Sequence, residues 1–180
     1  MIPEDIIDKV LDAVDSDELI SLTKDLVKIN SVWDPVDGTS EQVAAEHVAR
    51  WADRQGFEVQ LEEVVAARPN VIVTWTADPG QRNLMFEGHT DVVTPGDLSA
   101  WRYDPFGAEV VGRRMYGRGT NDTKGNLAAM LTAMAALKRS GVKLSGIIIG
   151  GVLCDEEDQM LGVRNFIERG HADTITGAII

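Results

Sequence analysis

The sequence predicts an α/β domain with a largely parallel central sheet flanked by helices. Two observations lead to this fold class. First, segments with helical periodicity alternate with strand-sized apolar runs, as in proteins built from strand–helix–strand units. Second, the run GIIIGGVLC at 146–154 is apolar on both faces, as is typical of a central strand that helices cover. Because sites in such sheets collect at the carboxyl ends of strands, we expect functional residues directly after strands.

The first third of the chain has the periodicity of helices. Apolar side chains recur every three or four positions, which places them on one face of each segment. Ser16 is expected to cap the second helix, and Thr39 and Gln42 have the spacing of a capping box at the start of the third. The expected helices are 3–14, 16–29 and 39–55, with a loop at 30–38 before the third.

The middle of the chain changes to the alternating pattern of strands. The segment FEVQLEEV at 57–64 alternates apolar and polar residues, as a half-buried strand does. Asp78, Pro79 and Gly80 are expected to form a turn between the next two strands. A helix at 124–138 is expected to end at Gly141. The expected strands are 57–64, 70–75, 83–88, 146–154 and 176–180, with a further helix at 159–169.

The composition excludes several classes of protein. The chain of 180 residues has 17 basic and 29 acidic residues, a net charge of −12, so we expect neither nucleic acid nor an anionic membrane as a partner. A single cysteine excludes an intrachain disulfide and a cysteine-based zinc finger. The start lacks the pattern of a signal peptide, and no run approaches the ~20 apolar residues of a membrane span. We therefore expect a soluble, cytoplasmic protein.

Three polar segments follow strand-like runs. They are GHTD at 88–91, GRGTNDTKG at 117–125 and DEED at 155–158. Side chains at positions i and i+2 of a strand point the same way, so the Asp91 carboxylate can accept a hydrogen bond from one ring nitrogen of His89. The other ring nitrogen is then free to bind a metal. Asp122, in the glycine-rich segment, can reach the same edge of the sheet.

The four consecutive carboxylates at 155–158 have two interpretations. In a solvated turn before a helix, they would interact favourably with the helix dipole. Partly buried at a sheet edge, they would need a cation or would bind protons. His89 and Asp122 favour the second interpretation, because an imidazole with several carboxylates suits zinc, cobalt or manganese, and zinc is the common choice for hydrolysis.

Other catalytic motifs do not fit the sequence. No Ser or Thr follows Lys124 directly, so the glycine-rich segment is not a phosphate-binding Walker loop. Asp122 stands where a dinucleotide fingerprint would have its third glycine. Cys154 continues an apolar strand, so we expect a small core residue and not a nucleophile.

Four motifs together resemble those of a known family. GHTDVV, W-x-x-DPF from Trp101 to Phe106, MYGRGTNDTKG and CDEED are similar, in this order and spacing, to motifs of the two-zinc aminoacylases and carboxypeptidases. That family includes acetylornithine deacetylase, succinyl-diaminopimelate desuccinylase and glutamate carboxypeptidases. The resemblance covers nearly the whole chain. It implies a three-layer sandwich, the zinc-exopeptidase-like catalytic domain, in incomplete form.

The resemblance also implies a role for each site residue. His89 would bind the first metal, Glu157 the second, and Asp122 would bridge both. Asp91 would orient His89. Glu156 would be the general base, which takes a proton from the metal-bridging water and returns it to the leaving amine.

Two further details come from the resemblance. The peptide bond after the bridging aspartate, Asp122–Thr123 here, would be cis. Departures from the family pattern at Asn121, Thr123 and Asp158 remove no ligand but leave the subfamily open.

The resemblance bears on the extent of the chain as well. Family members have roughly twice this many residues, so 1–180 would be the N-terminal portion of the catalytic domain, without its C-terminal part and without the dimerisation or lid domain. His171 does not match the family's C-terminal metal-binding histidine, and we expect a surface or structural role. The whole enzyme would hold two zinc or cobalt ions and form a homodimer, whereas this chain would hold one ion or none.

Two functional hypotheses follow. In the first, the protein is a metal-dependent hydrolase that cleaves the amide bond of N-acyl amino acids or small peptides, and this chain alone is inactive or nearly so. In the second, the chain is a non-catalytic half-domain that associates with itself or with a missing half through an exposed sheet edge. The number of bound metal ions and the hydrolytic activity of the isolated chain distinguish the two.

Overall fold

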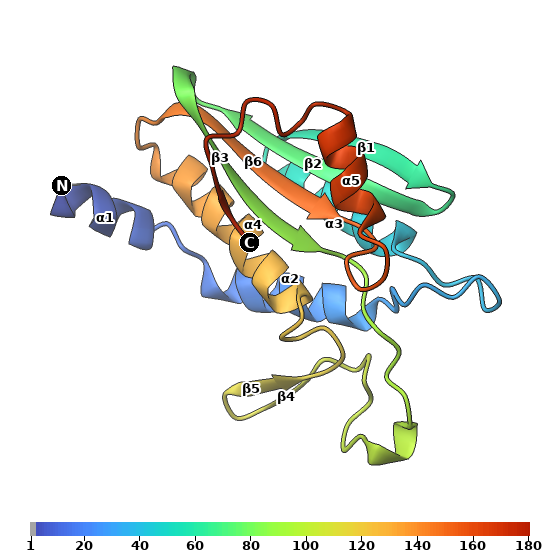
Figure 1. Ribbon diagram of the computed structural model, residues 1–180. Coiled ribbons are helices and arrows are strands. Elements are labelled where there is room, and N and C mark those ends of the chain that lie inside the picture. The colour runs from blue at the N-terminus through green and yellow to red at the C-terminus, as the bar shows by residue number, and fades with distance from the viewer. Residues whose placement is uncertain (1–2) are drawn as a thin grey trace.

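A five-stranded sheet with helices on both faces forms the centre of the molecule, which therefore has three layers (Figure 1). The computed structural model describes residues 3–180, except the side chains of 78–81. The strand order is β1-β2-β6-β3-β7. The strands are β1 (Glu58–Val65), β2 (Arg68–Thr76), β3 (Asp78–His89), β6 (Ser145–Leu153) and β7 (Gly177–Ile179).

The sheet is mixed, and its parallel part surrounds β3. β3 pairs in parallel with β6 and β7, whereas β2 pairs antiparallel with β1 and β6. The predicted α/β class is confirmed, and the parallel pairings lie in the half of the sheet that carries the expected site. The predicted turn at 78–80 is wrong. β3 already begins at Asp78, which pairs with Ser145 of β6. The register of this pairing is irregular between Asp78 and Asn83.

All five predicted helices are present, with ends shifted by a few residues. They are α1 (Glu4–Leu11), α2 (Ser16–Lys28), α3 (Gln42–Arg54), α4 (Lys124–Ser140) and α5 (Leu161–Glu168). Gly141 ends α4 in the left-handed conformation, with φ 67°, as predicted. The apolar face predicted for α1 is not buried, because this helix extends away from the sheet (Figure 1). In the described part of the chain, no helix has the length and apolar character needed to cross a bilayer.

Two predicted helix caps are wrong. Asp15, and not Ser16, caps α2, because its carboxylate accepts hydrogen bonds from two backbone N–H groups of the first turn. The capping box at α3 does not form. Thr39 takes part in an isolated β-bridge, and the Gln42 side chain donates to Glu46 at 2.6 Å instead of turning back to the helix start.

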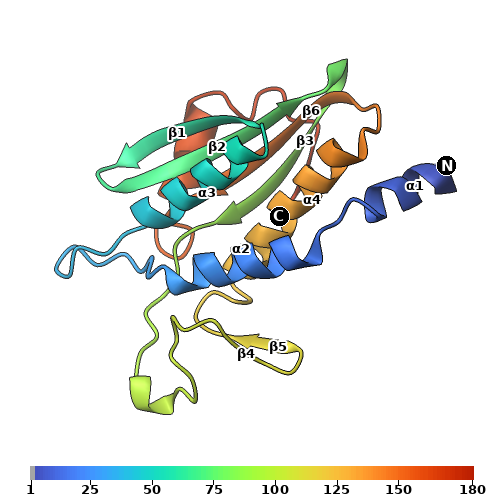
Figure 2. The ribbon, with the colours of Figure 1, turned by 180° about the vertical axis from the view of Figure 1, so that it is seen from behind.

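Two apolar cores lie on opposite faces of the sheet. Helices α2, α3 and α4 cover one face, where Leu26, Val48 and Leu131 are fully buried (Figure 2). Helix α5 covers the other face and packs Phe166 against strand residues such as Ile72. The two cores hold the central strands from both sides, and this fixes the sheet edge at which β3 and β6 end.

One part of the chain was not predicted from its periodicity. The short strands β4 (Glu109–Val111) and β5 (Arg114–Tyr116) form a hairpin apart from the main sheet, and the 3-10 helix η1 (Leu98–Ala100) lies in the same projecting region (Figure 1). Strands of three residues are too short to show an alternating pattern.

The core that joins three helices to the sheet should dominate stability. We expect Leu131→Ala to lower the free energy of unfolding by about 2–5 kcal/mol, because Leu131 is fully buried and the substitution leaves a cavity. Val36→Ala, at a side chain that is 91% exposed, is the control and should change it by less than about 0.5 kcal/mol. Urea unfolding followed by circular dichroism measures both. Equal effects of the two substitutions would contradict the assigned core.

Candidate metal centre

His89 is the last residue of β3 and is almost completely buried. Its Nδ1 lies 3.0 Å from the backbone oxygen of Asp91 and 3.4 Å from the Asp91 carboxylate. Both neighbours are acceptors, so Nδ1 carries a hydrogen and donates it. The lone pair of the neutral ring is then on Nε2, on the side away from Asp91. This is the orientation that a carboxylate imposes on a metal-binding histidine.

The loop after β3 is fastened to its surroundings by backbone and hydroxyl groups. The Thr90 N–H donates to the Leu153 oxygen at the end of β6, at 2.9 Å, and the Ser31 hydroxyl donates to the Thr90 oxygen at 2.6 Å. All three residues are buried. The direction of the His89 ring is therefore determined by the loop as well as by Asp91.

Asp122 approaches His89 from the segment that leads into α4. Its Oδ1 lies 3.2 Å from His89 Nε2, and its side chain is 67% exposed. The peptide bond Asp122–Thr123 is cis, which confirms the expectation from the family resemblance. The segment is anchored by Lys124, whose buried ammonium donates to the backbone oxygens of Leu26 at 2.9 Å and Ile29 at 2.7 Å. Burial lowers the pKa of Lys124 to about 7.

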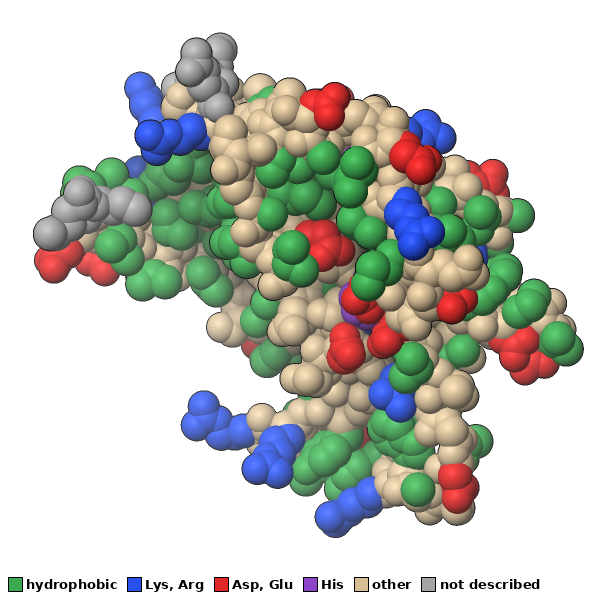
Figure 3. All heavy atoms as spheres, viewed as in Figure 1, with side chains coloured by type: hydrophobic (Ala, Val, Ile, Leu, Met, Phe, Trp, Pro, Cys, Tyr) green, Lys and Arg blue, Asp and Glu red, His purple; other side chains and the backbone are tan. Residues whose placement is uncertain are grey.

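Glu156 and Glu157 reach the same point from the turn after β6. Glu156 Oε2 lies 3.7 Å from His89 Nε2. The Glu157 backbone N–H donates to the Asp91 carboxylate at 2.9 Å. One possible ligand atom each from His89, Glu156 and Glu157 lie within 4.8 Å of one another. Figure 3 shows acidic side chains gathered around a histidine at the middle of this face.

The electrostatics of the cluster favour a bound cation. Burial alone would lower the pKa of His89, but the hydrogen bond and charge of Asp91 and the charge of Glu156 raise it to about 9. Burial and the charge of Asp122 raise the pKa of Glu157. Across residues 3–180, no Lys or Arg forms an ion pair with the exposed carboxylates of Asp122, Glu156 or Glu157. The Nε2 lone pair therefore faces carboxylate oxygens that repel it until a proton or a metal ion lies between them.

The acidic run at 155–158 is divided by the fold. Asp155 is fully buried and forms an ion pair with Arg68 at 2.6 Å. Glu156 and Glu157 point toward His89, and Asp158 is exposed. Arg68 and its second partner Glu41 were missed in the sequence, because nothing in their local pattern distinguishes them from surface charges.

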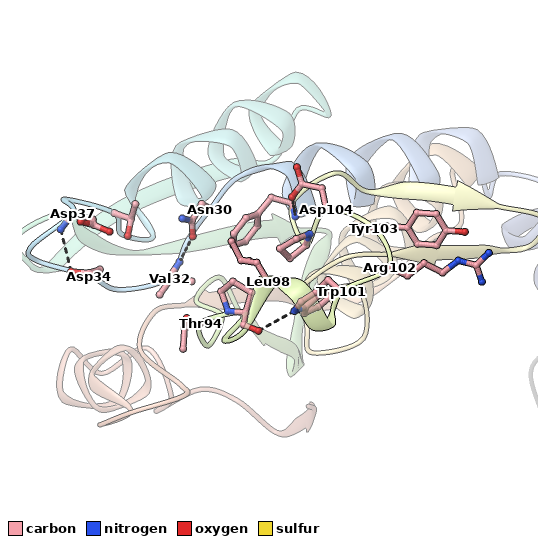
Figure 4. A pocket seen from close by; sticks show the side chains of 14 residues that line it. Asn30, Val32, Asp34, Asp37, Thr94, Leu98, Trp101, Arg102, Tyr103 and Asp104 are labelled. Carbon is pink, nitrogen blue, oxygen red and sulfur yellow. Dashed lines mark hydrogen bonds between the residues drawn. The ribbon is translucent and has the colours of Figure 1, made fainter.

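Two adjoining cavities lie near the cluster, apart from a smaller one of about 260 Å³ that Glu156 helps to line. The larger, of about 600 Å³, is between the loop at 30–39 and the segment at 94–106 and does not include the cluster; Figure 4 shows Trp101 on its wall, donating to a backbone oxygen. The second, of about 510 Å³, is lined by Asp91 and Glu157 and so borders the cluster directly. Both cavities are lined by Asp34 and Thr94, so they adjoin each other.

Comparison with known proteins identifies the family. The model for "Peptidase family M20/M25/M40" matches residues 85–180, which is more than half of the chain. The chain belongs to this peptidase family. The matched part of the family M20 chain contains all five predicted site residues: His89, Asp91, Asp122, Glu156 and Glu157.

The curated relatives of this family M20 member carry the names of metabolic hydrolases. It is 35% identical over 139 residues to a succinyl-diaminopimelate desuccinylase of Wolbachia sp. subsp. Brugia malayi, which covers 77% of this chain and 33% of the relative. It is 34% identical over 149 residues to an acetylornithine deacetylase of Aliivibrio fischeri, which covers 83% of this chain and 37% of the relative. The chain thus spans about a third of the length of these relatives.

Solved structures share the fold of this family M20 chain. The di-peptidase Dug1p from Saccharomyces cerevisiae superimposes with a TM-score of 0.82 at 18% identity, covering 94% of this chain and 40% of that one. Human carnosine dipeptidase 1 superimposes with a TM-score of 0.81 at 22% identity, covering 95% of this chain and 40% of that one. At such identities the likeness establishes the fold.

The structure brings the five predicted site residues together, and their individual roles remain predictions. Two other sequence predictions concern residues outside the cluster. His171 lies apart from it, with Nε2 3.0 Å from Glu62, in agreement with a structural role. Cys154 is buried, and its thiol donates to the Arg68 backbone oxygen at 3.4 Å.

The thiol of Cys154 should be unreactive in the folded protein. Burial raises its pKa to about 12, so almost no thiolate exists at pH 8. We expect iodoacetamide at pH 8 to alkylate the native protein at least about 100-fold more slowly than the protein unfolded in guanidinium, because the thiolate is the nucleophile. Mass spectrometry of timed samples measures both rates. Similar rates in the two states would show that Cys154 is accessible and would contradict this environment.

Proposed function

We propose that this chain is the metal-binding portion of a metal-dependent hydrolase that cleaves the amide bond of N-acyl amino acids or small peptides. The proposal depends mainly on one observation: His89 Nε2 faces Asp122 at 3.2 Å and Glu156 at 3.7 Å, and in the described part of the chain no Lys or Arg forms an ion pair with either carboxylate. Membership of a peptidase family supports it. The names of the relatives, a desuccinylase and a deacetylase, support the class of substrate.

In this proposal, His89, Asp122 and Glu157 hold divalent zinc, or cobalt, which suits a mixture of one imidazole and carboxylates. When bound, such ions polarise a carbonyl and lower the pKa of water toward neutrality. Asp91 keeps the proton of His89 on Nδ1 and so leaves Nε2 available. Only three of these groups are ligands, so we expect one ion in this chain and two in the whole enzyme.

Glu156 is the proposed general base. Its side chain is exposed, its Oε2 lies 3.7 Å from His89 Nε2, and within the described structure it accepts no hydrogen bond from a neighbouring side chain other than through this contact. A carboxylate with this freedom can take a proton from the attacking water and return it to the leaving amine. The cavity of about 510 Å³ beside Glu157 is the proposed place for the scissile end of the substrate.

Zinc binding to this chain should depend on His89. We expect calorimetric titration of metal-free protein with zinc to give one ion per chain, and His89→Ala to weaken binding at least about tenfold because a ligand is lost. His171→Ala removes a histidine that contacts a carboxylate outside the site, Glu62, and should leave the affinity unchanged. Absence of zinc binding to the unsubstituted chain, or equal weakening by both substitutions, would contradict the proposed site.

Glu156 should matter for turnover and not for metal affinity. If the zinc-loaded chain hydrolyses N-acetyl amino acids, we expect Glu156→Gln to reduce kcat by about 10²–10⁴-fold with little change in zinc affinity, because the amide cannot shuttle a proton. Turnover by the unsubstituted chain at a level typical of the family would exclude the non-catalytic half-domain. A Glu156→Gln protein as active as the unsubstituted one would exclude this general base.

A further inference from the structure

A buried network of three charged side chains lies directly behind the candidate site. The Arg68 guanidinium donates from Nε to both carboxylate oxygens of Glu41 at 3.0 Å, and from one terminal nitrogen to Glu41 at 2.6 Å. The same terminal nitrogen lies 2.6 Å from Asp155 Oδ1. Glu41 and Asp155 are fully buried, and Arg68 is 3% exposed. The three residues come from the start of α3, from β2 and from the turn after β6.

Stability alone does not account for this network. Removing charges from water costs more than their mutual attraction usually returns, so a buried ion pair is weak evidence for stabilisation. The network also has two carboxylates for one guanidinium. The face of Trp33 lies over the guanidinium at 4.6 Å, which encloses Arg68 further. Such a network is better explained by the conformation that it imposes on the chain.

The chain conformation at Asp155 identifies what the network holds. Asp155 has a φ of 63°, which is uncommon for a residue with a side chain. Its Oδ2 accepts hydrogen bonds from the N–H groups of Gln159 and Leu161, both at 3.2 Å, and its backbone oxygen accepts from the Met160 N–H at 2.7 Å. The turn at 155–161 is therefore closed around the Asp155 carboxylate, whose other oxygen contacts Arg68.

The two glutamates of the candidate metal centre are inside this turn. Glu156 and Glu157 follow Asp155 directly, and both are exposed, so their own packing holds them little. Their direction depends on the backbone of the turn and on one hydrogen bond, from the Glu157 N–H to Asp91. Any rotation at Asp155 would move both carboxylates away from His89.

We propose that Glu41 and Arg68 are positioning residues for Glu156 and Glu157. Glu41 holds the guanidinium, the guanidinium holds Asp155, and Asp155 determines the path of the turn that presents both glutamates to His89. Neither positioning residue lies in the part matched by the family model, 85–180, and neither contacts a proposed metal ligand. The consequence for metal binding rests on the proposed function, whereas the dependence of the turn on Glu41 does not.

The first test uses metal-free protein and Glu41→Gln, which keeps the shape of the side chain and removes its charge. We expect hydrogen exchange at the amides of Gln159, Met160 and Leu161 to become at least about tenfold faster, while amides in the centre of α4 change only by the factor common to the whole protein. Glu62→Gln is the matched control, because it removes a carboxylate of β1 that pairs with His171 and lies outside the network. It should leave exchange at 159–161 unchanged.

The second test measures cobalt affinity by the visible spectrum of the bound ion. We expect Glu41→Gln to weaken binding about 10–100-fold, as the loss of a supporting residue around a metal site does. In a Glu157→Gln background the same substitution should cause no further loss, because it acts through Glu157. An equal loss in both backgrounds would indicate general destabilisation and would overturn the proposal.

The two readouts separate the possible failures. If the unsubstituted protein binds no cobalt, the proposed function fails, and the exchange experiment still decides whether Glu41 controls the turn. Should Glu41→Gln fail to fold, Arg68→Lys replaces it, since lysine keeps the charge but cannot bond both carboxylates in the same way. Unchanged exchange at 159–161 in a folded variant, or a uniform increase along the chain, would overturn the positioning role.

Discussion

The parallel register between β3 and β6 is the constraint on which the candidate site depends. His89 pairs with Leu153 at the carboxyl ends of these neighbouring strands, so the loops that follow leave the sheet side by side. Distant parts of the sequence thereby contribute to one cluster. Because side chains alternate between the two faces, a slip of one residue would turn His89 to the other face and away from Glu156. The two apolar cores protect this register by fixing which face of each strand is buried.

Charged side chains also build the edge of the sheet that carries the site. Glu41, Arg68, Lys124 and Asp155 are buried there, although such residues are rarely buried without partners. Each has partners: Lys124 donates to carbonyl oxygens at the end of α2, and Arg68 pairs with both Glu41 and Asp155. Hydrogen bonds have preferred directions, unlike apolar contacts, so they hold loops in one arrangement. The site is thus supported by polar groups at its edge and by apolar groups behind the sheet.

Much of the fold and of the candidate site could be predicted from the sequence, for physical reasons. Helices and long strands have a periodicity that survives in the sequence, and His89 and Glu157 follow apolar strands, where sites collect. The caps were misassigned because Asp15 and Ser16 are both good caps and differ only in backbone geometry. The inward direction of Asp155 could not be predicted, because its neighbours are carboxylates too. Its pairing with Arg68 arises from tertiary packing, which a local sequence pattern does not reveal.

The difference in exposure between the candidate ligands has a consequence for the thermodynamics of ion capture. The His89 side chain is 8% exposed and is held by Asp91, whereas the Asp122 side chain is 67% exposed and Glu157 is exposed as well. Freezing an exposed glutamate side chain costs up to about 1.5–2 kcal/mol of conformational entropy, and the already buried histidine adds almost nothing to that cost. The imidazole therefore determines where a cation is held, and the ordering of the exposed carboxylates limits how tightly it is bound.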